Sequence, residues 1–249
     1  MDEFDPAGMM RSALSDVEYR MLNCLMELPA VAMQAARDKA GEEIRRATAT
    51  LAQRAERLVG ILSRVPHNVA EIILAGFLLP ETTRGLTRGE VAQAREAFGN
   101  RATSLANKAC VSYGPGRNPI AMAAFFNGNP AITIGNALYF QPPRWKSNFA
   151  SSRNDVPLFL HEFTHVIQWD RMGHAVFLRR YMREKKAAGS ADAMYNYSAR
   201  ATDFGHEMLE AQAQMVEDQT RFRLRIPPGQ ERRAEDLKRR LAGSGVYGL

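Results

Sequence analysis

The sequence predicts a predominantly helical α+β protein, and three observations carry that prediction. Apolar residues recur with helical spacing over residues 12–79, two short β-rich runs lie at 131–134 and 137–140, and an apolar helical segment begins near residue 156. The chain has 249 residues, of which 45% are hydrophobic and 24% charged, the composition of a globular protein that can bury a sizeable core.

Residues 1–82 are predicted to form an N-terminal helical region. One apolar face of it is formed by Tyr19, Leu22, Leu25 and Met26. Pro66 interrupts the helical pattern, and Pro80 ends the helix that follows. The apolar run 69–79 has about 11 residues and contains Glu71. Because a membrane span needs about 20 residues, we expect a buried helix and no membrane span. A structural cap is preferred here to a partner-docking surface.

The next helix is predicted from Thr87 to about Phe98. Thr87 is suited to cap its first turn because Glu90 follows three residues later, the spacing of a capping box. Gly99-Asn100 then gives the helix its expected end.

The runs 131–134 and 137–140 are predicted strands, and the pair Gly135-Asn136 between them indicates a turn or bulge. Gln141-Pro142-Pro143 stops the second strand. These strands either hold an extended peptide substrate by main-chain pairing or cover the helix that follows them. We place them in a second domain over residues 83–225.

A basic C-terminal tail is predicted over residues 226–249, beginning with the linker Pro227-Pro228-Gly229. Between residues 221 and 240, eight basic side chains oppose three acidic ones, so this segment carries most of the formal net charge of +6. The rest of the chain is nearly neutral. We therefore expect no nucleic-acid partner, and a nucleic-acid-associated function of the tail is the weakest alternative.

The compartment is predicted from the cysteines and the first residues. Cys24 and Cys110 are too few and too far apart for a disulfide framework, so we expect free, buried thiols in a reducing compartment. The start Met1-Asp2-Glu3-Phe4-Asp5-Pro6 is acidic and lacks the basic and apolar segments of a secretory signal. We expect cytoplasmic synthesis without a cleavable signal peptide.

The segment His161-Glu162-Phe163-Thr164-His165 carries the clearest chemical signal, on a helix that Asp155-Val156-Pro157 opens. His161 and His165 lie four residues apart, so both imidazoles project from one helix face and suit one tetrahedral Zn²⁺. Glu162 is placed to accept a proton from a water that zinc activates. The alternative is a pair of hydrogen-bonded core histidines, which needs no such base.

A catalytic zinc takes three protein ligands and keeps one position open, so a third ligand is required. A helix is predicted to begin near Gly205, with His206 and Glu210 on one stripe of it. We choose Glu210 as the third ligand and keep His206 as the alternative. Glu207 and Glu217 are expected to face solvent.

The longer signature HExxHxxGxxH is excluded, because Gln168 and Arg171 stand where it requires glycine and histidine. His174, which follows nine residues after the HExxH segment, is therefore expected to be a structural histidine or one at the rim of the site.

Tyr195 and Tyr197 lie between the two motif helices, and a tyrosine hydroxyl near zinc can stabilise an oxyanion. Between the two we prefer Tyr197 for this role. The alternative for both residues is packing in a partly buried segment.

Three segments together resemble a bacterial metallopeptidase family associated with contractile injection systems, which includes VgrG-related proteins near type VI secretion loci. Residues 131–140 resemble its "TxGN…IYF" strand, and residues 160–168 resemble its "LxHExTHVxQ" helix. Residues 210–218 resemble its later "ExxAxxVxD" helix. The resemblance covers roughly residues 90–218 and leaves out the N-terminal helices and the basic tail.

This resemblance implies a zincin-like metallopeptidase core of the gluzincin type, in which a small sheet accompanies an active-site helix and a glutamate helix. The implied zinc ligands are His161, His165 and Glu210, and the implied catalytic base is Glu162.

Zinc-dependent hydrolysis of peptide bonds is the function that these patterns favour, with a peptide, a protein or a cell-wall peptide as substrate. The chain would serve as an effector exported by an injection system or as a processing protease for its components. The alternative is a zinc-stabilised, non-catalytic adaptor of such an apparatus. The N-terminal helices are the expected contact for an apparatus component or an immunity protein.

Overall fold

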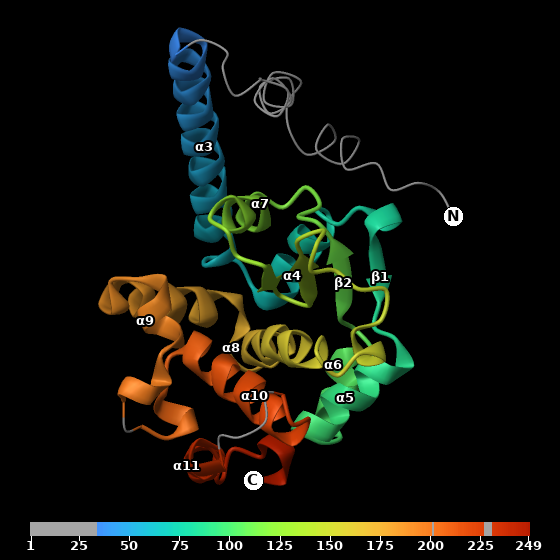
Figure 1. Ribbon diagram of the computed structural model, residues 1–249. Helices are drawn as coiled ribbons and strands as arrows, with labels where there is room; N and C mark the ends of the chain where they lie inside the picture. Colours follow the sequence, from blue (N-terminus) through green and yellow to red (C-terminus); the bar gives the residue numbers. More distant parts are fainter. Residues whose placement is uncertain (1–33, 201, 227–230) are drawn as a thin grey trace.

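The computed structural model describes residues 34–200, 202–226 and 231–249, and most of these lie in helices. The helices surround one small sheet, which lies beside the long helix α8 (Val156–Ala188) (Figure 1). The predicted class, predominantly helical α+β, is therefore confirmed. The helical face predicted over residues 12–33, Cys24 and the linker at 227–229 lie outside the described residues.

The described part of the N-terminal region consists of α3 (Gln34–Leu62) and α4 (His67–Ala75). Pro66 separates the two helices, as predicted, whereas α4 ends at Ala75, earlier than the end predicted at Pro80. One face of α4 packs inward, whereas Ile72 on the other face is 72% exposed. The expectation of a buried helix is confirmed for the face that carries Ala70 and Leu74 and is wrong for the face that carries Ile72. Within the described ranges, no helix combines the length and apolar character needed to cross a bilayer.

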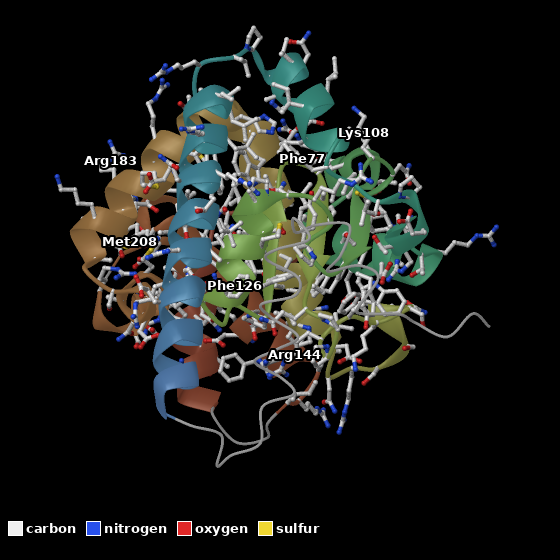
Figure 2. The ribbon with its side chains drawn as sticks, turned by 90° about the horizontal axis from the view of Figure 1, so that it is seen from above. Phe77, Lys108, Phe126, Arg144, Arg183 and Met208 are labelled. Carbon is white, nitrogen blue, oxygen red and sulfur yellow. The ribbon has the colours of Figure 1, made fainter. Side chains whose placement is uncertain are left out.

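Helix α7 (Pro119–Phe126) connects the N-terminal helices to the sheet by packing against both α3 and β3. Asn118 caps its first turn by accepting hydrogen bonds from the backbone N–H groups of Ile120 and Ala121. Seen from above, α3 lies across α7 near Phe126 (Figure 2).

Helix α5 (Arg88–Phe98) begins with the predicted capping box and ends at the predicted residue, and the short helix α6 (Arg101–Ala106) follows. The Thr87 hydroxyl accepts from the Glu90 N–H, while the Glu90 carboxylate accepts from the Thr87 N–H. Glu90 is fully buried and pairs with the Arg84 guanidinium through two hydrogen bonds of 2.8 Å. Arg84 holds the pKa of Glu90 below its usual value despite burial.

The sheet is mixed and has the strand order β1-β2-β4-β3. Its strands are β1 (Thr83–Gly85), β2 (Cys110–Tyr113), β3 (Ala131–Ile134) and β4 (Ala137–Phe140). β3 and β4 have the predicted bounds and pair as an antiparallel hairpin, so Gly135-Asn136 forms a turn, while β2 runs parallel to β4. β1 and β2 are strands that the sequence pattern did not indicate. β3 forms one edge of the sheet, on the side of α8.

Helix α8 lies between the sheet and α10 (Leu209–Arg223), so both faces of its first half are covered (Figure 1). At Gly173 the backbone leaves the helical conformation, with φ +70° and ψ 162°, and α8 bends sharply. The bend returns the second half of α8 toward the first, where Phe177 stacks on Trp169 with ring centroids 3.8 Å apart. This region requires glycine at position 173, since a side chain disfavours that conformation.

The C-terminal segment packs on the core. After α9 (Ala191–Tyr195), helix α11 (Glu231–Leu241) places Leu237 and Leu241 in the main hydrophobic cluster, together with Val246. Short 3-10 turns complete the described chain at Pro80–Thr82, Phe149–Ser151, Tyr197–Ala199, Phe204–His206 and Val246–Gly248.

Candidate metal centre

The first half of α8 is buried because apolar side chains occupy most of its faces, including Leu160, Phe163 and Val166, all of which are fully buried. Two histidines, His161 and His165, are buried on the same half of α8, four residues apart. His161 and His165 are each 5% exposed, and both rings point toward α10. An apolar helix that buries two imidazoles on one face needs partners for them.

Glu210 of α10 supplies the partner for both rings. Its Oε2 lies 3.5 Å from Nε2 of His161 and 3.2 Å from Nε2 of His165. One ligand atom from each of these three residues lies within 4.8 Å of the others, and Glu210 is 7% exposed. The structure thus brings together the three predicted ligands, which we call the triad.

The spacing of the triad fits a zinc-type cation. Zinc binds imidazole nitrogen at about 2.0–2.1 Å in a tetrahedron, which places neighbouring ligand atoms about 3.3 Å apart. The two distances to Glu210 Oε2 lie on either side of that value. Glu210 Oε2 is buried and faces both imidazole nitrogens. A buried carboxylate oxygen that two imidazole nitrogens face needs either protons or a cation between them.

The charges within the triad agree with this interpretation. Burial favours the neutral form of His161, but the neighbouring carboxylates of Glu210 and Glu217 outweigh it and raise the pKa of the ring to about 10. The pKa of His165 is raised by Glu210 in the same way, and the two rings lower the pKa of Glu210 against its burial. Without a metal, protons neutralise this cluster; a divalent cation can replace them.

Gln168 fixes the tautomer of His165. The Gln168 Nε2 donates to the backbone carbonyl of Leu209 at 3.1 Å and to Oε1 of Gln212 at 2.9 Å. Its Oε1 therefore faces Nδ1 of His165, at 2.7 Å, and must accept a proton from it. With Nδ1 engaged by Gln168, Nε2 is the nitrogen that faces Glu210 and is available to a metal ion.

Glu217 orients His161 in a similar way and lies about two helical turns after Glu210 on α10. Its Oε2 lies 3.1 Å from Nδ1 of His161, so the ring presents Nε2 to the triad. The expectation that Glu217 faces solvent is wrong. The same expectation is wrong for Glu207, which is 1% exposed and forms an ion pair of 2.8 Å with Arg200.

The start of α10 explains why Glu210 and not His206 joins the triad. The helix begins at Leu209, whose N–H donates to the Glu184 carboxylate at 2.8 Å, so Glu210 lies in its first turn. His206 lies earlier, in a separate 3-10 turn, and is exposed. The two residues do not share the helix that the sequence pattern indicated.

Glu162 lies beside the triad and is 5% exposed. Its Oε2 accepts a hydrogen bond of 2.7 Å from the hydroxyl of Thr133 in β3. Burial raises the pKa of Glu162, although the nearby His161 and His165 lower it and limit the effect. A buried carboxyl group with a raised pKa, next to a candidate metal centre, is suited to accept and return a proton.

The two candidate tyrosines occupy different places. The Tyr197 hydroxyl donates to Asp218 at 2.6 Å, and its ring lies in the main hydrophobic cluster. The Tyr195 ring instead stacks on His161, with centroids 5.9 Å apart. Burial and the charge of Glu210 raise the pKa of Tyr195 strongly, so its hydroxyl stays protonated. The structure thus places Tyr195, not the preferred Tyr197, next to a triad residue.

Tyr181 is a further residue near the triad that the sequence did not single out. It lies on the second half of α8, beyond the bend at Gly173. Burial raises its pKa, and the charges of Glu210 and Glu162 raise it further. A tyrosine sixteen positions after His165 becomes a neighbour only because the helix bends back, and no local pattern reveals that bend.

His174 is 1% exposed and lies away from the triad, in a second group with His67 and Glu71 of α4. Burial and the proximity of His67 lower the pKa of His174 to about 4. Its ring packs on Trp169 with centroids 4.8 Å apart. We refer to His67, Glu71 and His174 as the second cluster.

Comparisons of the chain with protein-family models, with curated proteins and with solved structures found no match. The arrangement of His161, His165 and Glu210 on two packed helices is consistent with the zincin-like site that the resemblance implies. A buried group that can hold a metal ion is what this arrangement establishes.

Proposed function

We propose that the protein is a zinc-dependent hydrolase of peptide bonds with a zincin-like core. One observation carries the proposal: Nε2 of His161 and Nε2 of His165 converge on one buried oxygen of Glu210, with Glu162 directly adjacent to His161 in the sequence. Three protein ligands leave a fourth position for water or substrate, which distinguishes a catalytic zinc from a closed structural one.

Within this proposal, the triad binds the metal and Glu162 moves the proton. Bound zinc supplies a Lewis acid that lowers the pKa of a water to about 7. The Glu162 carboxylate accepts the proton of the attacking water and passes it to the leaving amine nitrogen. The Thr133 hydroxyl, by donating to Oε2 of Glu162, holds the carboxylate in one orientation while it does so.

Tyr195 is the residue we assign to the oxyanion. Its ring lies on His161 and its hydroxyl remains protonated, so it can donate a hydrogen bond to negative charge that develops on the substrate carbonyl. This assignment replaces the preference for Tyr197, whose hydroxyl is engaged by Asp218.

The edge strand β3 is the element best placed to hold a peptide or protein substrate, including a cell-wall peptide. It forms one edge of the sheet and carries Thr133, which contacts Glu162. The Thr133 carbonyl, however, already accepts a hydrogen bond of 3.2 Å from the Trp169 indole. A substrate strand would therefore pair with the part of β3 before Thr133. Export by an injection system, as an effector or a processing protease, is the setting that the resemblance suggests.

A zinc-stabilised adaptor without catalysis is the second candidate, and the low exposure of the triad favours it. The three side chains are between 5% and 7% exposed, as in a structural metal site. Against it, a structural zinc takes a fourth protein ligand and has no use for a base such as Glu162.

The test compares wild type with Glu162→Gln, using Glu56→Gln at an exposed position as the matched control. Zinc content is measured by elemental analysis, and cleavage by mass spectrometry on a peptide library. We expect equal zinc content and a loss of cleavage of about 10²–10⁴-fold in Glu162→Gln only, the usual contribution of a general acid–base group. Zinc-loaded wild type that cleaves no peptide would contradict the proposal and favour the adaptor.

A further inference from the structure

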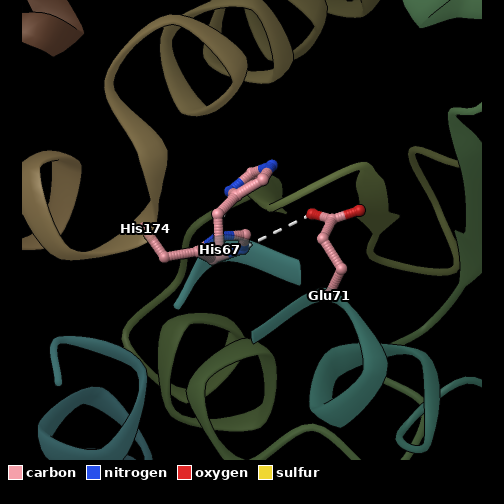
Figure 3. A group of neighbouring side chains, drawn as sticks. All are labelled: His67, Glu71 and His174. Carbon is pink, nitrogen blue, oxygen red and sulfur yellow. Dashed lines mark hydrogen bonds and ion pairs between the residues drawn. The ribbon is translucent and has the colours of Figure 1, made fainter. Parts of the chain in front are cut away.

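The second cluster joins two parts of the chain that are far apart in the sequence. His67 and Glu71 lie four residues apart on α4, and His174 follows the bend of α8 (Figure 3). Nδ1 of His67 is 2.9 Å from Nδ1 of His174, and Nε2 of His174 is 3.6 Å from Oε1 of Glu71. One ligand atom from each lies within 4.8 Å of the others.

Two glycines and one amide shape this cluster. Gly173, with its positive φ, sets the direction of His174 after the bend. Gly135 in the β3–β4 turn lies over the pair: an added Cβ there would stand 3.1 Å from Nε2 of His174 and 3.2 Å from Oε1 of Glu71. The Asn136 amide donates to the other Glu71 oxygen at 2.6 Å, which leaves Oε1 directed at His174.

Hydrogen bonding within the cluster cannot satisfy all of its atoms. One of the two facing Nδ1 atoms must donate to the other. If His174 donates, its Nε2 presents a lone pair to the Glu71 carboxylate, which is repulsive. If His174 accepts, its Nε2 carries the proton, but 3.6 Å is too long for a hydrogen bond to Glu71. In both tautomers, His174 Nε2 is buried and has no hydrogen-bond partner among the described residues.

We propose that His67, Glu71 and His174 form a second transition-metal site, of the zinc class. Two imidazoles and a carboxylate are donors that zinc-type cations accept, whereas calcium and magnesium take oxygen ligands. One ligand atom from each of the three residues lies within 4.8 Å of the others, and Nε2 of His174 lies 3.6 Å from Oε1 of Glu71, near the spacing of about 3.3 Å expected between neighbouring ligands of tetrahedral zinc. The contact of 2.9 Å with His67 involves the other ring nitrogen of His174, Nδ1. A cation also gives a partner to the unsatisfied His174 nitrogen.

The metal site would join two helices, α4 and α8. It fastens α4, and through it the N-terminal helices, to α8 at the point where the helix bends. The bend region also carries Trp169, which contacts both the His174 ring and the Thr133 carbonyl. Metal bound to the second cluster therefore stabilises the contact between α4 and α8, and this role does not depend on peptide hydrolysis at the triad.

The test uses full-length protein dialysed against Zn²⁺ at pH 7.5, with zinc counted by elemental analysis. His67→Ala is the decisive variant, because His67 is exposed and its removal leaves the core intact. Glu71→Ala is the second variant, and His206→Ala, which removes another exposed histidine, is the matched control. Far-UV circular dichroism verifies that each variant is folded.

We expect wild type and His206→Ala to bind two zinc ions, and His67→Ala and Glu71→Ala to bind one. The comparison rests on the difference of one ion, so it holds whether or not the triad is loaded and whether or not any peptide is cleaved. Wild-type zinc content in either His67→Ala or Glu71→Ala would overturn the proposal.

Discussion

The triad and the second cluster use the same side-chain types, two histidines and one glutamate, in different surroundings. In the triad, both imidazoles come from one helix, and each Nδ1 faces a polar partner, Gln168 or Glu217. In the second cluster, His67 is exposed, Glu71 is half-buried and only His174 is fully buried. The triad is therefore preorganised by its own neighbours, whereas the second cluster depends on the docking of α4 onto α8.

The two groups also differ in charge, and their pKa shifts have opposite signs. Two carboxylates, Glu210 and Glu217, face His161 and raise its pKa to about 10 despite burial. His174 faces one carboxylate, Glu71 at 3.6 Å, and burial and the neighbouring His67 lower the pKa of His174 to about 4. The comparison shows that the number of carboxylates around a buried imidazole, and not burial alone, decides its protonation. The triad also has Glu162 beside it, a buried carboxyl group with a raised pKa that is not one of the three candidate ligands.

Removing Glu210 is expected to have the largest effect. Structural zinc contributes about 10–16 kcal/mol through four ligands, so one ligand is worth roughly 3–4 kcal/mol, or about 10²–10³ in affinity. Glu210→Ala should lose zinc at the triad by this factor, together with hydrolysis. Competition with a chelator measures the affinity, with His206→Ala as the control. Loss of triad zinc in His206→Ala but not in Glu210→Ala would reverse the choice of third ligand.

Gly173→Ala is expected to weaken the bend that the two groups share. Its φ of +70° and ψ of 162° lie in a region open essentially to glycine alone, so alanine should lower the free energy of unfolding by about 1–3 kcal/mol. Gly60→Ala is the matched control: Gly60 lies within α3, nothing lies within 4 Å of an added Cβ, and alanine there should raise stability by about 0.5–1 kcal/mol. Thermal denaturation compares them; equal stability of Gly173→Ala and wild type would refute the strain argument.

Glu217→Gln is expected to reduce zinc affinity at the triad by about 10–100-fold, the usual effect of losing a residue that orients a ligating histidine. The variant keeps the size of the side chain and removes the charge that faces Nδ1 of His161. Glu56→Gln, at an exposed position, should leave the affinity unchanged. Wild-type affinity in Glu217→Gln would show that Glu217 does not orient His161.

The metal-free protein is expected to lose stability as pH rises. The pKa of His161 is raised from 6.5 to about 10 in the folded state, so the folded chain binds more protons in that window. This stabilisation is fully present below pH 6.5 and is lost as pH rises toward 10. Thermal denaturation should show a smaller decline in the His161→Gln variant. An equal decline in both proteins would show that His161 does not hold this proton.

Local sequence patterns were sufficient to predict the helices and strands whose positions are set by neighbouring residues. The capping box at Thr87, the β3–β4 hairpin and the helix that carries His161 and His165 follow from neighbouring residues, and their predicted positions agree with the structure. β1 and β2 could not be predicted in this way. They are short, and each is defined by pairing with a partner that is remote in the sequence.

The residues that contact the triad could be predicted only in part, because their positions depend on packing between segments that are far apart in the sequence. Spacing suggested Glu210, but the role of Glu217 required the position of α10 against α8, and that of Tyr195 required the return of the chain after the bend. The second cluster could not be predicted from the sequence, because His67 and His174 are 107 residues apart and no motif connects them.

Anomalous X-ray diffraction at the zinc edge, on crystals of the zinc-loaded protein, tests the central claim most directly. We expect an anomalous peak within bonding distance of Nε2 of His161, Nε2 of His165 and the Glu210 carboxylate, with the fourth position free of protein ligands. Absence of a peak at the triad would contradict the proposed catalytic zinc site. A peak whose fourth coordination position is occupied by a protein side chain would contradict it as well.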